Sequence, residues 1–199
     1  MLMIHTPGKA ETKVKNSRFL AEVFPVFSPD EAKEAWKIRK DTYDNGGHIV
    51  YAFTVGKSQN ISGCSDDGEP AGTAGRPVLA VLQGSGLTNA MITVARWFGG
   101  TKLGTGGLVH AYSDAAKAAL ANCVSIPLIP VLRVEFTIPG NLYSRCRYFL
   151  DSINFNTEKE EFTSSIFISG TIRECDREIF EKFITGLGSG KIVYSFFAV

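Results

Sequence analysis

The last third of the chain contains a change of hydrophobic period that strongly limits how it can fold. Residues 131–138 alternate apolar and polar side chains, as in a half-buried strand, and Pro139-Gly140 ends that pattern. Helix, strand, strand, helix and strand patterns follow at 142–153, 154–160, 162–172, 180–187 and 191–199. This βαββαβ order predicts a ferredoxin-like domain at 131–199, with an antiparallel sheet that carries both helices on one face.

A less regular region precedes this domain. Pro127 and Pro130 each restrict the preceding residue to extended conformations, which indicates a linker between a domain at 1–126 and the one at 131–199. The first domain is predicted to be α+β, with a mostly antiparallel sheet. Its strands are expected at 12–27, 48–55 and 89–98, and its helices at 29–43, 77–82 and 107–122.

Charge and cysteine usage exclude several classes of protein. The net charge is +1, from 21 basic and 20 acidic residues, so bulk charge does not predict strong non-specific binding of nucleic acid. No window approaches the roughly 18 apolar residues that a membrane span needs. The cysteines lie far apart and form no Cys-x-x-Cys pair, which indicates buried or free thiols in a reducing compartment. We therefore expect a cytoplasmic protein without membrane contact.

Of the 20 glycines, 14 fall between residues 46 and 107, where two unusual loops occur. The first loop, 64–77, carries three carboxylates within four residues: Asp66, Asp67 and Glu69. Such carboxylates repel one another unless a cation, an arginine or backbone N–H groups offset their charge. One interpretation is a site for Mg²⁺ or a cationic partner, and the other is a tight turn in which aspartates accept hydrogen bonds from nearby N–H groups.

The second loop, 96–107, is a glycine-rich turn between a buried-looking strand and a helix. Such a turn presents free N–H groups and the positive end of a helix dipole, which suit a phosphate or a carboxylate, and Arg96 and Lys102 add positive charge. Its spacing matches neither common glycine-rich nucleotide motif. His48 and His110 lie far apart, and no catalytic motif occurs, so the sequence favours a protein that is not an enzyme.

Together the two loops resemble the signature of the IMPACT/YigZ family. The similar segments read SDDGEPAGTAGxP at 65–77 and RWFGGxKLGxGGLVxAY at 96–112, with further similarity at 15–19 and 48–56. The resemblance implies an N-terminal domain with the fold of the second domain of a small-subunit ribosomal protein, followed by the ferredoxin-like domain. It also implies a link to translational control, through eukaryotic members, and nucleic-acid binding, which is suggested from fold similarity.

Three hypotheses for the loops follow. The first is a binding or regulatory protein that contacts RNA, the ribosome or a translation protein. The alternative is a phosphate-ligand enzyme or sensor, in which the second loop holds an anion while the acids of the first hold Mg²⁺, the one cofactor considered. In the third, Asp66 or Asp67 pairs with Arg96 or Lys102 and serves the fold alone. The predicted binding surface comprises Asp66, Asp67, Gly68, Glu69, Thr73, Arg76, Arg96, Gly99, Gly100, Lys102, Gly104, Gly106, Gly107 and Tyr112.

Overall fold

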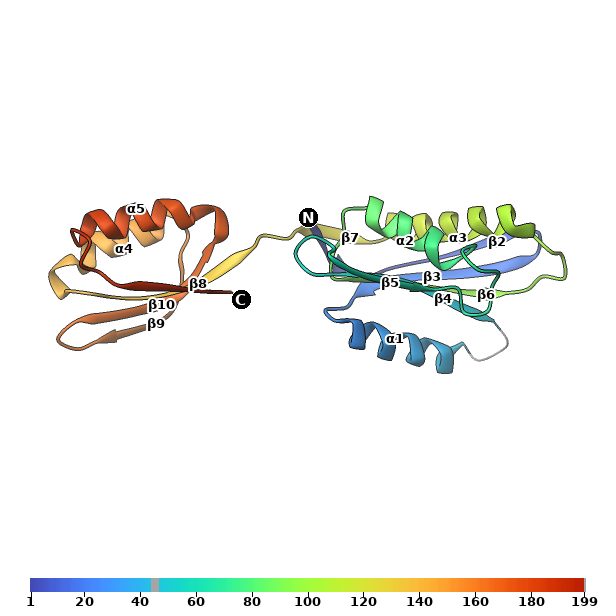
Figure 1. Cartoon of the computed structure of the whole chain (residues 1–199), viewed down its shortest axis with the longest axis horizontal. Helices are drawn as coiled ribbons and strands as arrows, with labels where there is room; N and C mark the ends of the chain where they lie inside the picture. The colour runs from blue at the N-terminus through green and yellow to red at the C-terminus, as the bar shows by residue number, and fades with distance from the viewer. Residues whose placement is uncertain (44–46, 199) are drawn as a thin grey trace. The chain divides into compact units, whose positions relative to one another are not determined.

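The computed structural model describes residues 1–43 and 47–198 (Figure 1). Gly46 in the glycine-rich region and Val199 in the last predicted strand lie outside the described residues. Contacts between Cα atoms divide the chain into two compact units, Met1–Leu128 and Ile129–Val199, and each has its own hydrophobic core. Among the described residues, no helix is both long enough and apolar enough to cross a membrane.

The N-terminal unit is built on antiparallel strands. These are β1 (Leu2–Thr6), β2 (Gly8–Val14), β3 (Ser17–Pro25), β4 (His48–Val55), β5 (Ile61–Ser65), β6 (Ala90–Trp97) and β7 (Val124–Pro127). Five of them form one sheet in the order β2-β3-β6-β4-β5, and β1 pairs with β7 in a small second sheet. The predicted antiparallel α+β architecture is therefore confirmed.

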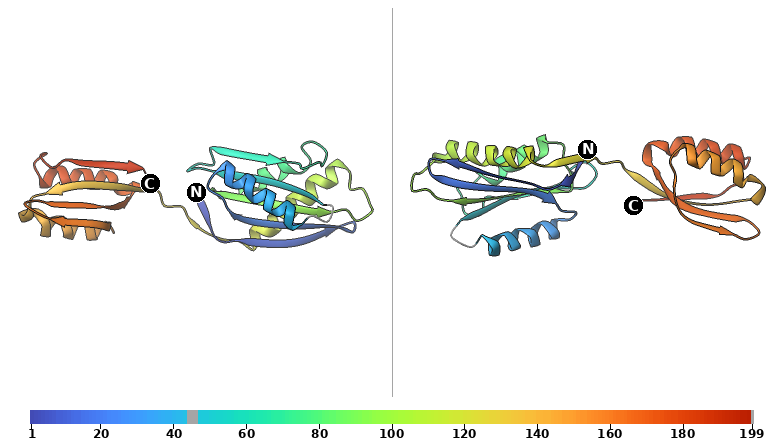
Figure 2. Two further views of the ribbon diagram at one scale, coloured as in Figure 1. Left: turned by 90° about the horizontal axis from the view of Figure 1, so that it is seen from below. Right: turned by 180° about the vertical axis from the view of Figure 1, so that it is seen from behind.

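Helices cover both faces of the five-stranded sheet. α2 (Gly75–Gly84) and α3 (Gly104–Ala121) lie on one face, and α1 (Pro29–Thr42) lies on the other (Figure 1, Figure 2). Strand β6 occupies the middle of the sheet, and its apolar residues are buried because both faces are covered. The larger core lies under α2 and α3, where the buried rings of Phe19 and Tyr112 meet edge to face at 5.2 Å.

Several predicted elements differ from the observed ones. The strand predicted at 12–27 is wrong, because the chain reverses at Lys15 and Asn16, whose φ angles are 45° and 66°, and forms the β2–β3 hairpin. Helix α3 begins at Gly104, before the predicted position 107, so its first turn contains glycines assigned to the loop. Strands β1, β5 and β7 were not predicted.

The C-terminal unit has the predicted βαββαβ order. Its elements are β8 (Val131–Ile138), α4 (Tyr143–Ser152), β9 (Asn156–Phe162), β10 (Ile166–Arg173), α5 (Arg177–Leu187) and β11 (Tyr194–Ala198), and short 3-10 turns at Gly140–Leu142 and Glu174–Asp176 precede the helices. The antiparallel sheet order is β11-β8-β10-β9, and both helices lie on one face (Figure 2). This is the ferredoxin-like arrangement.

Candidate functional site

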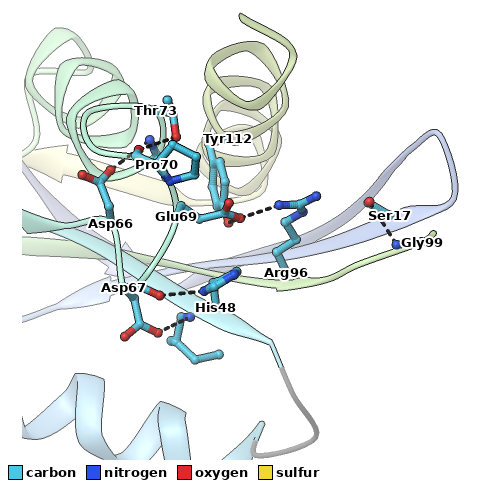
Figure 3. Close-up of polar contacts among 12 residues, drawn as sticks. Ser17, His48, Asp66, Asp67, Glu69, Pro70, Thr73, Arg96, Gly99 and Tyr112 are labelled. Carbon is cyan, nitrogen blue, oxygen red and sulfur yellow. Dashed lines mark hydrogen bonds and ion pairs between the residues drawn. The ribbon is translucent and has the colours of Figure 1, made fainter. Parts of the chain in front are cut away.

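The loop between β5 and α2 uses Asp66 to begin a helix (Figure 3). The Asp66 carboxylate accepts hydrogen bonds from the backbone N–H groups of Gly72, Ala74 and Gly75 at 2.8, 3.0 and 2.8 Å. Ala74, the N-cap of α2, has no side-chain oxygen, so the Asp66 carboxylate takes its place and accepts hydrogen bonds from N–H groups at the helix start. Burial opposes ionisation of Asp66, but the three N–H donors outweigh it and hold the pKa of this carboxyl below its usual range.

Asp67 contacts a different part of the unit, strand β4 and helix α1. One carboxylate oxygen accepts a hydrogen bond from the Ile49 N–H at 2.6 Å, and the other pairs with Lys40 Nζ at 2.5 Å. The Asp67 carbonyl oxygen lies 2.7 Å from His48 Nδ1, which donates to it (Figure 3). Gly68 follows with a φ of 88°, as the tight-turn interpretation requires. Asp67 therefore ties the acidic loop to neighbouring elements.

Glu69 joins the two loops through a buried ion pair. Its Oε1 accepts hydrogen bonds from Arg96 Nη1 and from the Tyr112 hydroxyl, both at 2.6 Å (Figure 3). The Glu69 and Arg96 side chains are only 4% and 8% exposed, so each buried charge depends on the other. Burial, and then the bond to the Glu69 carboxylate, raises the pKa of Tyr112 well above its usual range. The two loops do pair, but through Glu69 rather than through either aspartate.

A cavity of about 370 Å³ lies beside this ion pair at the start of α3. Its lining includes Glu69, Arg96, Phe98, Lys102, Gly104 and Leu108. The Arg96 guanidinium lies 5.6 Å from the centre of the Phe98 ring, within the range of a cation–π contact. Within residues 1–43 and 47–198, the buried Nε of Arg96 has no hydrogen-bond partner. The cavity therefore combines positive charge, apolar walls and the beginning of a long helix.

The glycine-rich turn is fixed to the tip of the β2–β3 hairpin. Gly99 N donates a hydrogen bond to Ser17 Oγ at 3.2 Å (Figure 3). A Cβ on Gly99 would lie 2.0 Å from the backbone carbon of Asn16, so this close approach requires glycine. Beside this contact, the Arg18 guanidinium lies 3.9 Å from the centre of the Trp97 ring. The turn and the hairpin tip thus form one edge of the unit.

The predicted binding surface does not form a single site. Glu69, Arg96, Lys102 and Gly104 line the cavity, whereas Asp66 and Asp67 make the structural contacts described above. Tyr112 is fully buried and belongs to the core instead of a surface. The remaining predicted residues have separate positions: Thr73 bonds to the Pro70 carbonyl, Gly99 meets the hairpin, Arg76, Gly106 and Gly107 lie in the first turns of α2 and α3, and Gly100 is exposed.

The structure does not bring the three acids together as the Mg²⁺ interpretation of the acidic loop requires. Asp66 and Asp67 accept hydrogen bonds from different backbone segments, and Glu69 faces Arg96, so the three carboxylates do not converge. The part of the chain that the structure describes holds no group of three or more His, Cys, Asp or Glu side chains that could bind a metal ion. The charge repulsion that motivated the prediction is offset by N–H groups, Lys40 and Arg96.

Comparison with known proteins shows to which family this chain, with its α+β fold and two paired loops, belongs. The family model for the Impact N-terminal domain matches residues 15–120. An IMPACT family member of Haemophilus influenzae is 34% identical over 188 residues, which cover 92% of this chain and 90% of that protein. The chain belongs to the IMPACT family, as the loop signature indicated.

Two further comparisons extend this result. Protein IMPACT of Homo sapiens is 31% identical over 104 residues, which cover 48% of this chain and 31% of that protein. A crystal structure of a hypothetical protein aligns over 100% of this chain and 96% of its own, with a TM-score of 0.68 and 26% identity. The likeness to the human protein is thus confined to part of each chain, whereas the solved structure shares the whole fold.

Proposed function

We propose that this chain is a non-catalytic binding protein that contacts RNA of the translation apparatus through its N-terminal unit. The observation that carries the proposal is a cluster of cations and aromatic rings where the hairpin tip meets the glycine-rich turn. We call this cluster the hairpin edge, and it comprises Lys15, Arg18, Trp97, Phe98 and Lys102.

The chemistry of the hairpin edge suits single-stranded RNA. Lys15, Arg18 and Lys102 are exposed, and Phe98 is 58% exposed although it is a large apolar residue. Cations of this kind bind backbone phosphates, and exposed aromatic rings stack on unpaired bases. A small basic edge also explains how a chain with a net charge of only +1 can contact RNA locally.

The state of the acidic loop supports binding over catalysis. Its carboxylates are engaged with backbone N–H groups, with Lys40 or with the buried Arg96, which leaves them unsuited to proton transfer. Burial and the charge of Asp66 raise the pKa of the neighbouring Cys64 thiol, so little nucleophilic thiolate forms near neutral pH.

Family membership supports the connection with translation. The resemblance to the IMPACT/YigZ family implies a link to translational control through its eukaryotic members. Human Protein IMPACT is similar to this chain over 104 residues. The proposal places the protein in the cytoplasm, where ribosomes work. The four cysteines are free thiols in the described structure, which fits a reducing compartment.

The test is a titration of the full chain with fluorescently labelled single-stranded RNA and with ribosomes, at about 50 mM and about 200 mM salt. The double variant Lys15→Ala/Arg18→Ala removes two cations from the hairpin edge. We expect it to bind at least about tenfold more weakly, with a salt slope lower by about two.

The matched control is Lys33→Ala/Lys37→Ala, which removes two exposed cations from α1 in the same unit. We expect this control to bind RNA as the unaltered chain does. An equal loss in both double variants contradicts the assignment to the hairpin edge. Failure of the unaltered chain to bind RNA or ribosomes at the lower salt contradicts the function itself.

A further inference from the structure

The start of α3 presents backbone donors to solvent. Its N-cap, Leu103, supplies no side-chain hydrogen bond, and the first turn carries no acidic residue. Gly104 and Gly106 are exposed, and apart from the adjoining backbone no described atom lies within 4 Å of the position that a Cβ would occupy at either glycine. The helix has 18 residues, so its N-terminus carries the equivalent of about half a positive charge. A ligand can therefore approach these N–H groups closely.

Arg96 provides an independent indication of an anion at the same place. Its side chain is 8% exposed and lines the cavity beside α3. Glu69 accepts a hydrogen bond only from Nη1 of this guanidinium, and neither Nε nor Nη2 has an acceptor among the described residues. Nε is fully buried, so no ligand in the cavity reaches it, whereas Nη2 is not fully buried. Donors of largely buried charged groups are nearly always paired in folded proteins, and an anionic oxygen in the cavity can accept from Nη2.

The charges and walls of the cavity specify the chemistry of that anion. Arg96 and Lys102 contribute two positive charges and Glu69 one negative charge, which leaves one positive charge before the helix dipole is counted. Lys102 forms no ion pair within the described ranges. Leu108 and the Phe98 ring make the walls apolar, which lowers the local dielectric and strengthens attraction for an anion. The volume of about 370 Å³ lies in the range of small-molecule sites.

From these observations we infer that the cavity at the start of α3 binds the phosphate group of a nucleotide. The phosphate oxygens accept from the first N–H groups of α3, from Arg96 and from Lys102, while the exposed Phe98 ring packs on the attached base. Two sources share this chemistry: a nucleotide unit of bound RNA and a free nucleoside phosphate. The first source rests on the proposed function, and the second does not.

The test measures binding of inorganic phosphate and adenosine monophosphate to the full chain by calorimetry, with adenosine as the phosphate-free control. We expect both phosphates to bind and adenosine to fail. Lys102→Ala is expected to weaken binding of both phosphates about tenfold. Thr105→Asp places a carboxylate in the exposed first turn of α3 and is expected to abolish phosphate binding. A carboxylate at this position stabilises the helix, so folding is preserved. Lys117→Ala, an exposed lysine far along the same helix, is the matched control and is expected to have no effect.

The outcomes separate the cavity from the proposed function. Absence of phosphate binding to the unaltered chain, unchanged binding by Thr105→Asp, or equal losses in Lys102→Ala and Lys117→Ala overturns the inference. RNA binding without binding of either phosphate contradicts the phosphate site in the cavity but not the proposed function. Binding of adenosine monophosphate without RNA binding supports the cavity, assigns it to a free nucleotide and contradicts the proposed function. Binding of both, with RNA also weakened by Lys102→Ala, supports the cavity as part of the RNA contact.

Discussion

The carboxylate of Glu69 accepts a hydrogen bond from Arg96 at 2.6 Å, although the two residues lie 27 positions apart in the sequence. Both side chains are buried, and the contact joins the acidic loop to the strand that leads into the glycine-rich turn. Removal of either partner leaves a charge inside the unit without its counter-charge. The pair therefore controls both the stability of the N-terminal unit and the position of Arg96 in the cavity.

Glu69→Ala is expected to destabilise the N-terminal unit by about 3–5 kcal/mol, because Arg96 is left buried and unpaired. Tyr112→Phe removes one hydrogen bond to the same carboxylate and is expected to cost about 1–2 kcal/mol. Urea unfolding followed by tryptophan fluorescence measures both, since the two tryptophans, Trp36 and Trp97, lie in this unit. A smaller loss for Glu69→Ala than for Tyr112→Phe would show that the ion pair is not a main support.

Acid should weaken the N-terminal unit partly through Asp66. The pKa of Asp66 is lowered in the folded state, so its stabilising effect is complete above the unfolded-state pKa of about 3.9. That effect is lost as the pH falls from there through the folded-state pKa, because the unfolded chain takes up the proton first. Asp66→Asn is expected to cost about 0.5–2 kcal/mol at neutral pH and to flatten the dependence below about pH 4.

Urea midpoints measured across this pH range check the Asp66 prediction. Asp114→Asn is the control, because Asp114 is 67% exposed on α3 and pairs with the exposed Lys117. Its acid dependence should follow that of the unaltered chain. An identical acid slope for Asp66→Asn would mean that the three N–H contacts do not favour the charged carboxylate.

Two glycines in or beside the second loop should respond to alanine in opposite directions. Gly99→Ala forces a Cβ to within 2.0 Å of the Asn16 backbone, so the turn has to separate from the hairpin at a cost of about 1–3 kcal/mol. Gly106→Ala meets no described atom within 4 Å and lies in the first turn of α3, so a gain of about 0.5–1 kcal/mol is expected. Unfolding midpoints of the same sign for both variants would contradict the close approach.

The cysteines of the C-terminal unit should differ strongly in reactivity. Cys146 is fully buried, and burial raises its pKa to about 11, so only about one thiol in a thousand is ionised at pH 8. Cys175 is exposed. Iodoacetamide labelling of the folded chain, read by mass spectrometry, should modify Cys175 well before Cys146, and denaturant should remove the difference. Equal rates in the folded chain would contradict the burial of Cys146.

The C-terminal unit was predictable because its signals are local. Leu132, Val134, Phe136 and Ile138 alternate in the sequence, and all four are buried on the helix-covered face of β8. The N-terminal unit offers weaker signals. The β2–β3 turn uses Lys15-Asn16 rather than a glycine pair, and every residue of β7 is exposed, so neither the turn nor the strand shows a distinctive pattern.

The two loops of the candidate site could be predicted from the sequence, but the residues that they contact could not. The repulsion among the acids indicated that something must offset their charge, and the glycines indicated a close backbone approach. The partners are distant: Asp67 meets Lys40 and Ile49, and Gly99 meets Ser17. These partner residues do not stand out in the sequence. Only the register of the folded sheet determines which N–H group or cation each loop meets.

The pairing of β1 with β7 has a consequence for synthesis on the ribosome. Leu2 lies opposite Pro127, and the Leu128 N–H donates to the Met1 carbonyl at 3.0 Å, so the small sheet joins residues from both ends of the N-terminal unit. In a chain made from its N-terminus, Leu2 can bond to Gly86 and Thr88 before β7 has emerged, but the pairing of β1 with β7 has to wait for β7. Emergence of β7 requires that translation has already entered the C-terminal unit. The first unit therefore cannot complete its hydrogen bonding before part of the second has been made.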